Sequence, residues 1–430
     1  MLDLKGKSIS LIGFGESNKA LYRFFTKKGI KVLIRSKEDC SLPSGQGGVF
    51  GDGYLDTDED IIFRSPGVHP RLIKGKGTVY TEVGFGLERA RCKKIAVTGS
   101  DGKTTTTTLI HQMLNRGGKN ALLGGNIGKP IVEFSASLSR DDYLVTELSS
   151  FQLMDMCPYL DVAVVTNVSQ NHLDWHADMD EYICAKRNIT KNATLAVLNY
   201  DDLIVRDFEC KKKIYFSLEN QLDRVNDGED FVHLADGKIL YNKTEILPLS
   251  QVRLSGEYNL RNVMSAIGAT YGIIDRDKAA LVAKEFCGVG GRSEEICKID
   301  GVTYVNSPID TTPSRTKSTL SAYPLNRVVA ILGGYDKNLD YECLKTELSQ
   351  LKALVLCGEN KEKIRRVASC HTICVNTLDE GVSACRGLAA DGDYVVLTPA
   401  SASFDMFKNY KEKGRAFERA VLLLDRKRKK

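Results

Sequence analysis

The chain has 430 residues, of which 42% are hydrophobic, 8% aromatic and 27% charged. This composition excludes a disordered or collagen-like chain, and the length predicts roughly two to four domains. The formal net charge is +5, and the last five residues, 426–430, are all basic, so the rest of the chain is neutral. We interpret the tail as a solvated helix end and expect no nucleic-acid partner.

Membrane and export signals are missing from the sequence as given. No apolar run approaches the roughly 18 residues that a membrane-spanning helix needs, so we expect no membrane insertion. The first residues lack the apolar stretch and cleavage site of a signal peptide. The 12 cysteines contain no C-x-x-C pair. Reduced thiols, no zinc site and a cytoplasmic location are therefore expected.

Short β-rich runs alternate with longer mixed runs, a pattern typical of α/β folds with parallel sheets. The first segment begins with a strand in 7–15 that ends in a glycine turn. A helix is predicted over 17–28, and further strands over 31–35 and 60–67. We expect a Rossmann-like domain over 1–92.

The second segment begins with a strand and loop over 93–104 and continues with a helix over 105–114. Later strands are predicted at 142–147, 162–167 and 193–199, and a polar stretch at 219–244 is read as hairpins or a surface excursion. Two helices, 259–271 and 278–286, precede the glycine-rich linker 287–292. We expect a central mononucleotide-binding domain of P-loop type over 93–288.

The third segment is predicted to be a second Rossmann-like domain over 289–430. Its predicted final helix covers 403–427. Its predicted strands are 302–306, 327–332, 353–357 and 393–398. Ligands in such sheets bind at the carboxyl ends of the strands, and the motifs described next fall there.

A phosphate-binding loop is the clearest chemical signal. Val97-Thr-Gly-Ser-Asp-Gly-Lys-Thr104 stands between a predicted strand and a predicted helix. Glycines let backbone N–H groups face an anion, Lys103 adds a full positive charge, and the Thr104 hydroxyl can reach a magnesium ion. The spacing is tighter than in the Walker A loop, which requires glycine where Val97 stands. Nucleotide-phosphate binding is predicted.

Three further polar residues follow predicted strands or lie close to them in sequence. Glu147 ends the strand 142–147, and a carboxylate beside a phosphate loop suits Mg²⁺. His172 follows the strand 162–167, and Lys186 lies fourteen residues further on. Each of these residues alone is also consistent with an ordinary structural or surface role.

Taken together, the motifs resemble the Mur ligase family, which joins amino acids to peptidoglycan precursors using ATP. The motifs occur in the family's order from Gly13 to about Phe417. They are Gly-Ser-Asp-Gly-Lys-Thr-Thr (99–105), Gly-Gly-Asn-Ile-Gly (124–128), Glu-Leu-Ser-Ser-Phe-Gln-Leu (147–153), Asn-His-Leu-Asp (171–174), the segment around Lys186, Gly-Glu-Tyr-Asn-Leu-Arg-Asn (256–262), Gly-Gly-Tyr-Asp-Lys (333–337) and Ser-Ala-Ser-Phe-Asp-Met-Phe-Lys-Asn-Tyr (401–410). The last motif and the turn Gly13-Phe-Gly-Glu-Ser-Asn18 are similar to the branch that adds D-glutamate.

The resemblance implies a set of substrates and cofactors. The substrates would be UDP-N-acetylmuramoyl-L-alanine, D-glutamate and ATP, with two Mg²⁺ ions, and the chain would be a monomer. The reaction would pass through an acyl phosphate that an amine attacks. His172 is a candidate base, but a role in the metal site is favoured. Lys186 is expected to be carbamylated, which would turn an ammonium into a metal-binding, carboxylate-like group.

The resemblance also assigns residues to each ligand. Catalytic roles fall to Lys103, His172 and Lys186. The metal ligands would be Thr104, Glu147, His172 and Lys186. ATP would be bound by Gly99, Gly102, Lys103, Thr104, Thr105, Asn259, Asn262 and Arg292. The substrates would be bound by Ser17, Asn18, Ser65, Asn126, Ser149, Thr311, Lys337, Ser403 and Tyr410.

The stretch that follows the first strand of the third domain departs from the family's sequence pattern. The family's Asn-Asp-Ser-Lys-Ala-Thr reads Asn306-Ser-Pro-Ile-Asp-Thr311 here, so the usual Asp is Ser307 and the usual Lys is Ile309. Asp310 is a candidate to replace that Asp by a shift of position. One interpretation is a lineage variant with a re-aimed loop, and the alternative is a different amino-acid preference or a weakened enzyme.

The glycine turn at 13–18 is not G-x-G-x-x-G, and Arg35 stands where a dinucleotide-binding domain has an acidic residue. We therefore expect no redox cofactor, and we expect the positive turn to suit a uridine diphosphate. Two alternative functions remain open. One is a Mur-type or folylpolyglutamate-synthase-like ligase for another amino acid. The other is a non-catalytic paralogue that binds a UDP-sugar or ATP.

Overall fold

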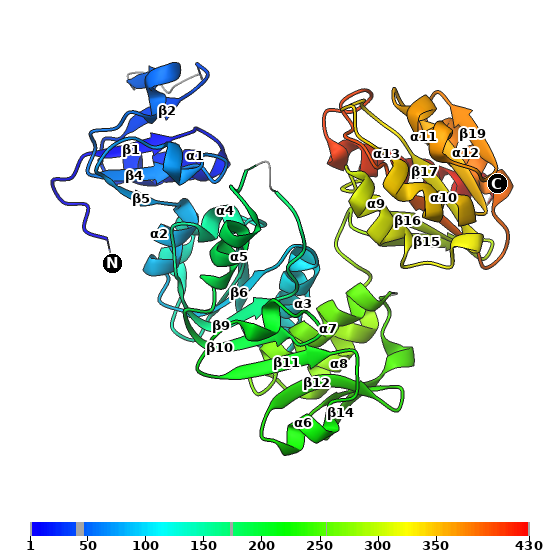
Figure 1. Ribbon diagram of the computed structural model, residues 1–430, viewed down its shortest axis with the longest axis horizontal. Coiled ribbons are helices and arrows are strands. Elements are labelled where there is room, and N and C mark those ends of the chain that lie inside the picture. The colour runs from blue at the N-terminus through cyan, green and yellow to red at the C-terminus, as the bar shows by residue number, and fades with distance from the viewer. Residues whose placement is uncertain (1, 40–46, 173–174, 255, 429–430) are drawn as a thin grey trace. The chain divides into compact units, whose positions relative to one another are not determined.

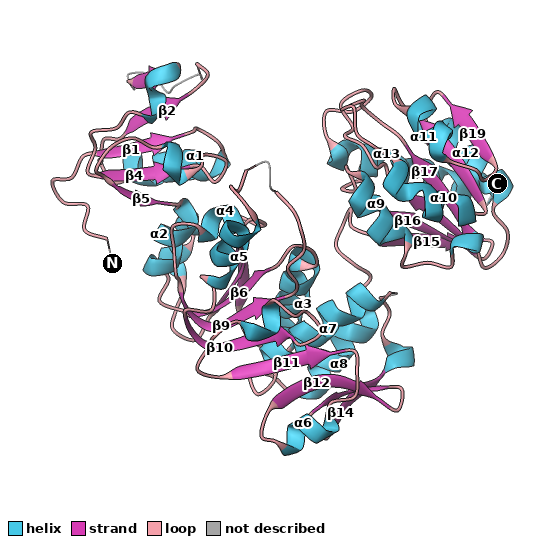
Figure 2. Cartoon of the chain, viewed as in Figure 1, coloured by secondary structure: helices cyan, strands magenta, loops and turns pink. Residues whose placement is uncertain are grey.

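The computed structural model describes residues 2–39, 47–172, 175–254 and 256–428. The chain divides into two compact units, one formed by 1–252 and 259–285 and the other by 253–258 and 286–430. Three sheets with helices packed against them make up the α/β architecture that the sequence predicts (Figures 1 and 2). Two of the sheets lie in the first unit. The boundaries at 92 and 288 remain predictions.

The first sheet is parallel and has the strand order β3-β2-β1-β4-β5. Phe25, Phe63 and Phe85 form the centre of its buried core. Its elements are β1 Ile9–Ile12, α1 Glu16–Lys27, β2 Leu33–Ser36, β3 Gly48–Phe50, β4 Ile61–Arg64, β5 Thr78–Tyr80 and α2 Glu82–Arg89. The carboxyl ends of the adjacent strands β1 and β4 carry the Gly13 turn and the Ser65 turn.

A buried carboxyl group makes this region sensitive to pH. Glu82 is 2% exposed and accepts a hydrogen bond from the Val132 amide at 2.8 Å. Burial raises the pKa of Glu82 to about 7. Between the unfolded value of 4.5 and this value, the folded chain holds a proton that the unfolded chain has lost, so stability falls as pH rises through the interval.

We therefore expect Glu82→Gln to stabilise the protein at about pH 8 by about 1–3 kcal/mol, because glutamine can keep the acceptor oxygen without the buried charge. Urea unfolding measures the gain, which should shrink as the pH is lowered toward 5. Glu88→Gln, on the exposed face of the same helix, is the matched control. An equal gain at both ends of the pH range would contradict the explanation.

The central sheet has the order β14-β13-β12-β11-β10-β9-β6-β8-β7. It is parallel from β7 to β12 and ends in two antiparallel hairpins. Its strands are β6 Lys93–Thr98, β7 Ala121–Gly125, β8 Tyr143–Glu147, β9 Tyr159–Val165, β10 Asn192–Asn199, β11 Lys213–Ser217, β12 Asp230–Ala235, β13 Lys238–Tyr241 and β14 Thr244–Pro248. The helices are α3 Lys103–Arg116, α4 Ser150–Leu153, α5 Met179–Arg187, α6 Leu222–Asn226, α7 Glu257–Thr270 and α8 Arg276–Glu285.

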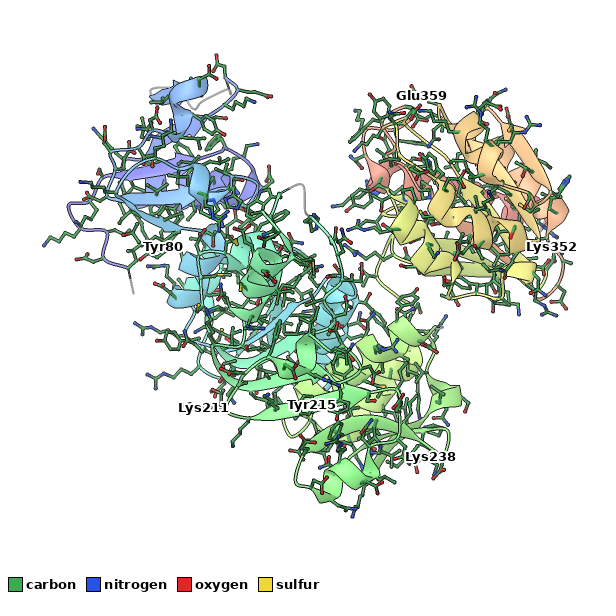
Figure 3. All side chains as sticks on the ribbon, viewed as in Figure 1. Tyr80, Lys211, Tyr215, Lys238, Lys352 and Glu359 are labelled. Carbon is green, nitrogen blue, oxygen red and sulfur yellow. The ribbon has the colours of Figure 1, made fainter. Side chains whose placement is uncertain are left out.

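The strand order explains why the predicted site residues meet. Strand β6 lies between β8 and β9, so the segments that follow these three strands share one edge of the sheet. The phosphate loop follows β6, Glu147 ends β8, and the polar segment from Thr166 follows β9. At the other end of the sheet, the stretch 219–244 forms hairpin strands. Of the two interpretations made from the sequence, the structure has the hairpins and not the surface excursion. Lys238, which Figure 3 labels, lies on this sheet edge and pairs with Glu245 at 2.7 Å.

The third sheet forms the core of the second unit and has the order β15-β16-β20-β17-β18-β19, with only β15 antiparallel. Buried aliphatic side chains cover both of its faces. Its strands are β15 Glu294–Ile299, β16 Val302–Asn306, β17 Val328–Leu332, β18 Ala353–Cys357, β19 Thr372–Val375 and β20 Tyr394–Leu397. The helices are α9 Pro313–Leu320, α10 Lys345–Gln350, α11 Lys361–Val367, α12 Leu378–Leu388 and α13 Tyr410–Arg428.

The final helix begins later than predicted. The sequence prediction starts it at Ser403, but α13 starts at Tyr410. The Asn409 side chain accepts a hydrogen bond from the Glu412 amide at 3.0 Å, and the Glu412 carboxylate accepts one from the Lys408 amide at 2.9 Å. These reciprocal bonds cap the helix at Asn409. Residues 403–409 form turns instead.

Over the described residues, no helix is both long and apolar enough to cross a membrane. Cys92, Cys357 and Cys385 are buried thiols that form no disulfide.

Candidate functional site

The phosphate loop has the geometry that the sequence predicts. Gly102 precedes helix α3 with a φ of 79°, and an added Cβ atom would lie 2.2 Å from the Asn262 side-chain oxygen. Glycine is therefore required here for both conformation and space. Lys103 and Thr104 begin the helix, followed by the half-buried Thr105. The first turn of α3 thus presents backbone N–H groups and a lysine at one point.

Two loop carbonyls hold the Lys103 side chain. Its ammonium donates to the oxygens of Gly99 and Ser100, both at 2.8 Å. A phosphate bound in the loop would offer this ammonium a charged acceptor in place of the two neutral ones. The loop is therefore compact around the cation that the ligand is expected to engage.

Glu147 is the centre of a second group of predicted residues. Its buried carboxylate accepts the Thr104 hydroxyl at 2.5 Å and the Asn126 amide at 2.7 Å. The three residues come from α3, the end of β7 and the end of β8. The sequence alone did not predict these contacts, because the three residues lie far apart along the chain and are brought together by the order of the strands.

Lys186 lies on the inner face of α5 and is 1% exposed. Its ammonium donates to the Gly99 carbonyl at 2.6 Å, the same oxygen that Lys103 binds. It also lies 4.6 Å from the centre of the Tyr182 ring. Burial, and then the positive charge of Lys103, hold the pKa of Lys186 well below its usual value. Lys186 therefore loses its proton more readily than an exposed lysine does.

The predicted magnesium ligands fit a hard cation in part. Thr104 and Glu147 bring a hydroxyl and a carboxylate oxygen together, as Mg²⁺ requires. An unmodified Lys186 offers no lone pair for a cation while it is protonated. Within the described parts of the chain, no cluster of three or more His, Cys, Asp or Glu residues forms a metal site. A Mg²⁺ site here would thus depend on Thr104 and Glu147 with additional oxygen ligands.

The structure places His172 against the Phe151 ring, with centroids 5.0 Å apart and a backbone φ of 56°. Ser149 caps α4, because its hydroxyl accepts the Gln152 amide at 3.3 Å and donates to the Gln152 side chain at 3.1 Å. The substrate role predicted for Ser149 would share the hydroxyl with this cap. The substrate role of Ser149 and the metal and catalytic roles of His172 remain predictions.

Helix α7 brings two of the predicted ATP residues toward the phosphate loop. Asn259 and Asn262 are both buried, and the Asn262 side-chain oxygen accepts the Thr106 hydroxyl at 3.3 Å. Arg292 belongs to the second unit, in a turn where its amide donates to Val289 at 2.8 Å. The role of all three residues in binding ATP remains a prediction.

In the first sheet, the predicted substrate residues surround one turn. Asn18 is fully buried, and its amide donates to the carbonyls of Ile12, Gly13 and Phe63 at 2.9, 2.7 and 3.2 Å. Its amide hydrogens therefore fasten the ends of β1 and β4, which is a structural role beside the predicted substrate contact. Ser65 lies against this turn, since a Cβ on Gly13 would be 2.9 Å from the Ser65 Cβ. Half-buried Ser17 lies in the first turn of α1.

Arg35 does not supply the positive turn expected for a uridine diphosphate. It lies inside β2, and its buried guanidinium pairs with Glu59 at 2.9 Å. The ion pair neutralises its charge locally. The sequence could not reveal this, because Glu59 is 24 residues away.

In the second unit, Lys337 and Ser403 lie near one another. The Lys337 ammonium is 5.7 Å from the ring centre of Phe404, the residue after Ser403. Ser403 is buried, and its hydroxyl has no hydrogen-bond partner among the described residues. Thr311 lies in the loop after β16, and Tyr410 begins α13. An unpartnered buried hydroxyl is costly unless a ligand uses it.

Asp310 does not offer the carboxylate suggested by a shift of position. It is buried, and its carboxylate accepts the Thr398 hydroxyl at 2.8 Å. Burial raises the pKa of Asp310 to about 6. The side chain therefore points into the unit, which corrects the expectation that it replaces the missing aspartate. The Arg315 guanidinium donates to the Ile309 carbonyl at 3.4 Å, so a cation does lie beside the position where the family's lysine is absent.

The sequence analysis did not predict a set of hydrogen bonds that holds the phosphate loop in place. The Asn167 side chain binds both backbone groups of Asp101, accepting its N–H and donating to its C=O, each at 3.0 Å. The Ser100 hydroxyl lies 2.8 Å from the Tyr182 hydroxyl. The only signal in the sequence was the polar end of the predicted strand 162–167.

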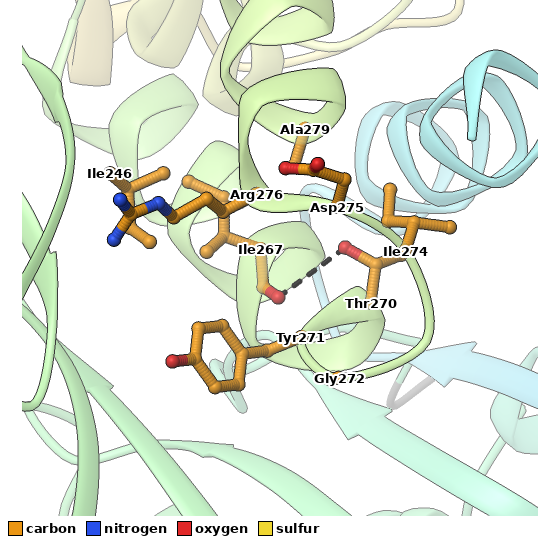
Figure 4. Close-up of a pocket in the computed structure, with 9 residues that line it drawn as sticks. All are labelled: Ile246, Ile267, Thr270, Tyr271, Gly272, Ile274, Asp275, Arg276 and Ala279. Carbon is orange, nitrogen blue, oxygen red and sulfur yellow. Dashed lines mark hydrogen bonds between the residues drawn. The ribbon is translucent and has the colours of Figure 1, made fainter.

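A pocket of about 370 Å³ lies at the other end of α7 from Asn259 and Asn262 (Figure 4). Tyr271, Asp275 and Arg276 line it together with aliphatic side chains. Asn262, which lies against Gly102, and Thr270, which lines the pocket, are eight residues apart on α7, or about 12 Å of helix. It is distinct from the candidate site.

The strand–loop–helix with Lys103, the acidic strand end and the buried Lys186 form a candidate nucleotide-binding site, and the comparisons show which class of protein carries it. Residues 97–270 match the model of the Mur ligase middle domain. The chain belongs to the Mur ligase family, whose members are ATP-dependent ligases.

Two proteins that are similar in sequence over nearly their full length share one enzyme name. The chain is 37% identical to UDP-N-acetylmuramoylalanine–D-glutamate ligase of Acetivibrio thermocellus and 36% identical to that of Clostridium perfringens. Each comparison covers 97% of this chain and 97% of the relative.

Solved structures share the fold. UDP-N-acetylmuramate-alanine ligase MurC of Thermotoga maritima matches with a TM-score of 0.61 at 15% identity, covering 97% of this chain and 99% of that one. A pseudomurein peptide ligase type C of Methanothermus fervidus matches with a TM-score of 0.55 at 18% identity, covering 91% and 96%. At these identities the likeness shows the architecture alone.

Proposed function

We propose that this chain joins D-glutamate to UDP-N-acetylmuramoyl-L-alanine at the expense of ATP, a step of peptidoglycan precursor synthesis. The observation that carries the proposal is the 37% identity to a ligase of that name over 97% of both chains. The gathering of Lys103, Glu147 and Lys186 at one sheet edge supports it. We further propose a cytoplasmic, monomeric enzyme.

The chemistry needs an activated carboxylate. The substrate carboxylate attacks the γ-phosphorus of ATP, which gives an acyl phosphate and ADP. The amine of D-glutamate then attacks the acyl carbon, phosphate leaves, and the amine loses a proton. Phosphoryl transfer depends mainly on positioning and charge neutralisation. Bound Mg²⁺ would add positive charge at the phosphates, held by Thr104 and Glu147 and by Lys186 in carbamylated form.

Several residues of the chain would bind the phosphates, neutralise their charge and orient the substrates. Lys103 would exchange its two carbonyl acceptors for phosphate oxygens and neutralise charge that develops during transfer. The N–H groups at the start of α3 would hold the phosphates, in a turn that the positive φ of Gly102 allows. Asn126 would orient Glu147, to which it donates at 2.7 Å, toward the acceptor side. Asn259, Asn262 and Arg292 are the proposed nucleotide contacts.

The remaining proposals concern the two other substrates. Ser17, Asn18 and Ser65 would hold the UDP group, with Ser149 near the acceptor. Thr311, Lys337, Ser403 and Tyr410 would hold the carboxylates of D-glutamate. The buried, unpartnered hydroxyl of Ser403 supports this assignment, since a carboxylate would satisfy it.

We expect phosphate release from ATP in the presence of UDP-N-acetylmuramoyl-L-alanine only when D-glutamate is added, with a ligated product of matching amount. L-glutamate, D-aspartate and no amino acid are the comparisons. Release with a different amino acid would keep the ligase chemistry and change the substrate. No release in any mixture, with nucleotide binding retained, would instead support the non-catalytic paralogue.

A further inference from the structure

Glu181, in the first turn of α5, lies where several charged groups converge. Its carboxylate is 8% exposed and accepts the Ala177 amide at 2.9 Å. Arg71 pairs with it at 2.7 Å, His69 lies 3.4 Å away, and the His176 ring nitrogen lies 3.3 Å away. The bond to the Ala177 amide belongs to the cap of α5, in which Asp178 accepts the Glu181 amide at 2.8 Å, whereas the contacts with Arg71, His69 and His176 are additional to that cap.

His69 and Arg71 end a segment that we call the substrate turn, residues 64–71, because it carries Ser65. Arg64, fully buried at its start, donates to the Val68 carbonyl at 2.9 Å and to the Phe151 carbonyl at 2.5 Å, and pairs with Asp155. The substrate turn is therefore joined to the segment after β8 by one ion pair and to α5 by another. In both pairs the substrate turn supplies the arginine and the partner segment supplies the carboxylate.

An aromatic contact completes the junction. The Trp175 ring lies between His69 and Phe151, with centroids 4.5 and 4.2 Å away, and its N–H donates to the Gly67 carbonyl at 3.1 Å. Packed rings resist sliding more than a flexible ion pair does. The substrate turn is thereby held by two ion pairs and by the contacts of Trp175.

Helix α5 connects this junction with the phosphate loop. One residue after Glu181, the Tyr182 hydroxyl lies 2.8 Å from the Ser100 hydroxyl. One further turn along the helix, Lys186 donates to the Gly99 carbonyl. A single short helix therefore touches the substrate turn at its beginning and the phosphate loop along its inner face.

We propose that Glu181 is a positioning residue that fixes the substrate turn relative to the phosphate loop, and so places the acceptor carboxylate of the UDP-linked substrate for attack on ATP. The inference rests on the proposed function. Misplacement by about 1 Å can cost a reaction up to 10²-fold, so a modest loosening here has a measurable effect. The exposed Arg71 gives the pair little weight in global stability.

The test compares steady-state kinetics of Glu181→Gln, Arg71→Met and the double variant in the full chain. Glutamine keeps an acceptor for the Ala177 amide and removes the charge. We expect kcat/KM for UDP-N-acetylmuramoyl-L-alanine to fall about tenfold in Glu181→Gln, through a lower kcat and a higher KM for this substrate, with KM for ATP changed less than about twofold. Arg71→Met should act in the same direction, and the double variant should be no worse than Glu181→Gln.

The matched control is the Arg116–Glu285 ion pair, which joins α3 and α8 on the surface of the same unit. Arg116→Met and Glu285→Gln should leave every KM unchanged. Changes in Glu181→Gln no larger than in these controls, equal effects on both KM values, or additive effects in the double variant would overturn the inference. If Glu181→Gln fails to fold, the steady-state kinetics of Arg71→Met, a change at an exposed position, still test the inference. An inactive wild-type protein would refute the proposed function instead.

Discussion

Replacing Lys103 with methionine is expected to lower kcat for ligation by about 10³-fold, because the phosphate loop then loses the full positive charge that neutralises the transferring phosphoryl group. Methionine keeps the length of the side chain but cannot donate. The helix N-terminus and its N–H groups remain, so nucleotide binding should weaken less than turnover does.

Phosphate release at saturating substrates measures kcat, and calorimetric titration with a non-hydrolysable ATP analogue measures binding. Lys191→Met, at an exposed position after α5, is the control for removal of a lysine. Turnover in Lys103→Met within tenfold of this control would show that Lys103 does not carry the charge stabilisation.

The sequence was sufficient for the phosphate loop, because all of its parts are local. A strand, two glycines, a lysine and a threonine occur within twelve residues, and the spacing alone specifies the turn. The α/β class followed from the alternation of elements in the same way. The contact of Thr104 with Glu147 required the order of the strands, which periodicity does not contain.

Charged and polar residues whose partners lie far along the chain were the hardest to interpret. Arg35 was expected in a positively charged turn and is neutralised inside a strand by Glu59. Asp310 was a candidate for a ligand contact and is buried against Thr398. Asn18 was assigned to substrate and also donates to three carbonyls that end strands. In each case the role of the side chain depends on partners that the tertiary structure brings together, and the local sequence pattern does not indicate these partners.

The two lysines at the phosphate loop raise an electrostatic problem. Lys103 and Lys186 both donate to the carbonyl oxygen of Gly99, at 2.8 and 2.6 Å. Two ammonium groups so placed repel one another, and Lys186 has no water to screen it because it is fully buried. Deprotonation of Lys186 relieves the repulsion, in agreement with its lowered pKa. A neutral amine, unlike an ammonium, has a lone pair that can attack carbon dioxide.

Carbamylation of Lys186 would form an N–C bond between its neutral amine and carbon dioxide, with release of one proton. The product is an anion with two oxygen acceptors beside Thr104 and Glu147, where a divalent cation would complete the charge balance. The positive charge of Lys103 would then attract the modified side chain instead of repelling it. The proposed modification would thus convert an unfavourable pair of charges into a favourable one.

We therefore expect Lys186→Ala and Lys186→Arg each to lower kcat by about 10²-fold or more, since arginine keeps the positive charge but cannot form the carbamate. Wild-type activity should fall in buffer depleted of carbon dioxide and return when bicarbonate is added, whereas Lys191→Met should behave as wild type. Carbon NMR of protein equilibrated with labelled bicarbonate should show a carbamate signal that both Lys186 variants lack. Full activity in Lys186→Arg, or a fully active wild type without that signal, would show that Lys186 acts as an unmodified amine.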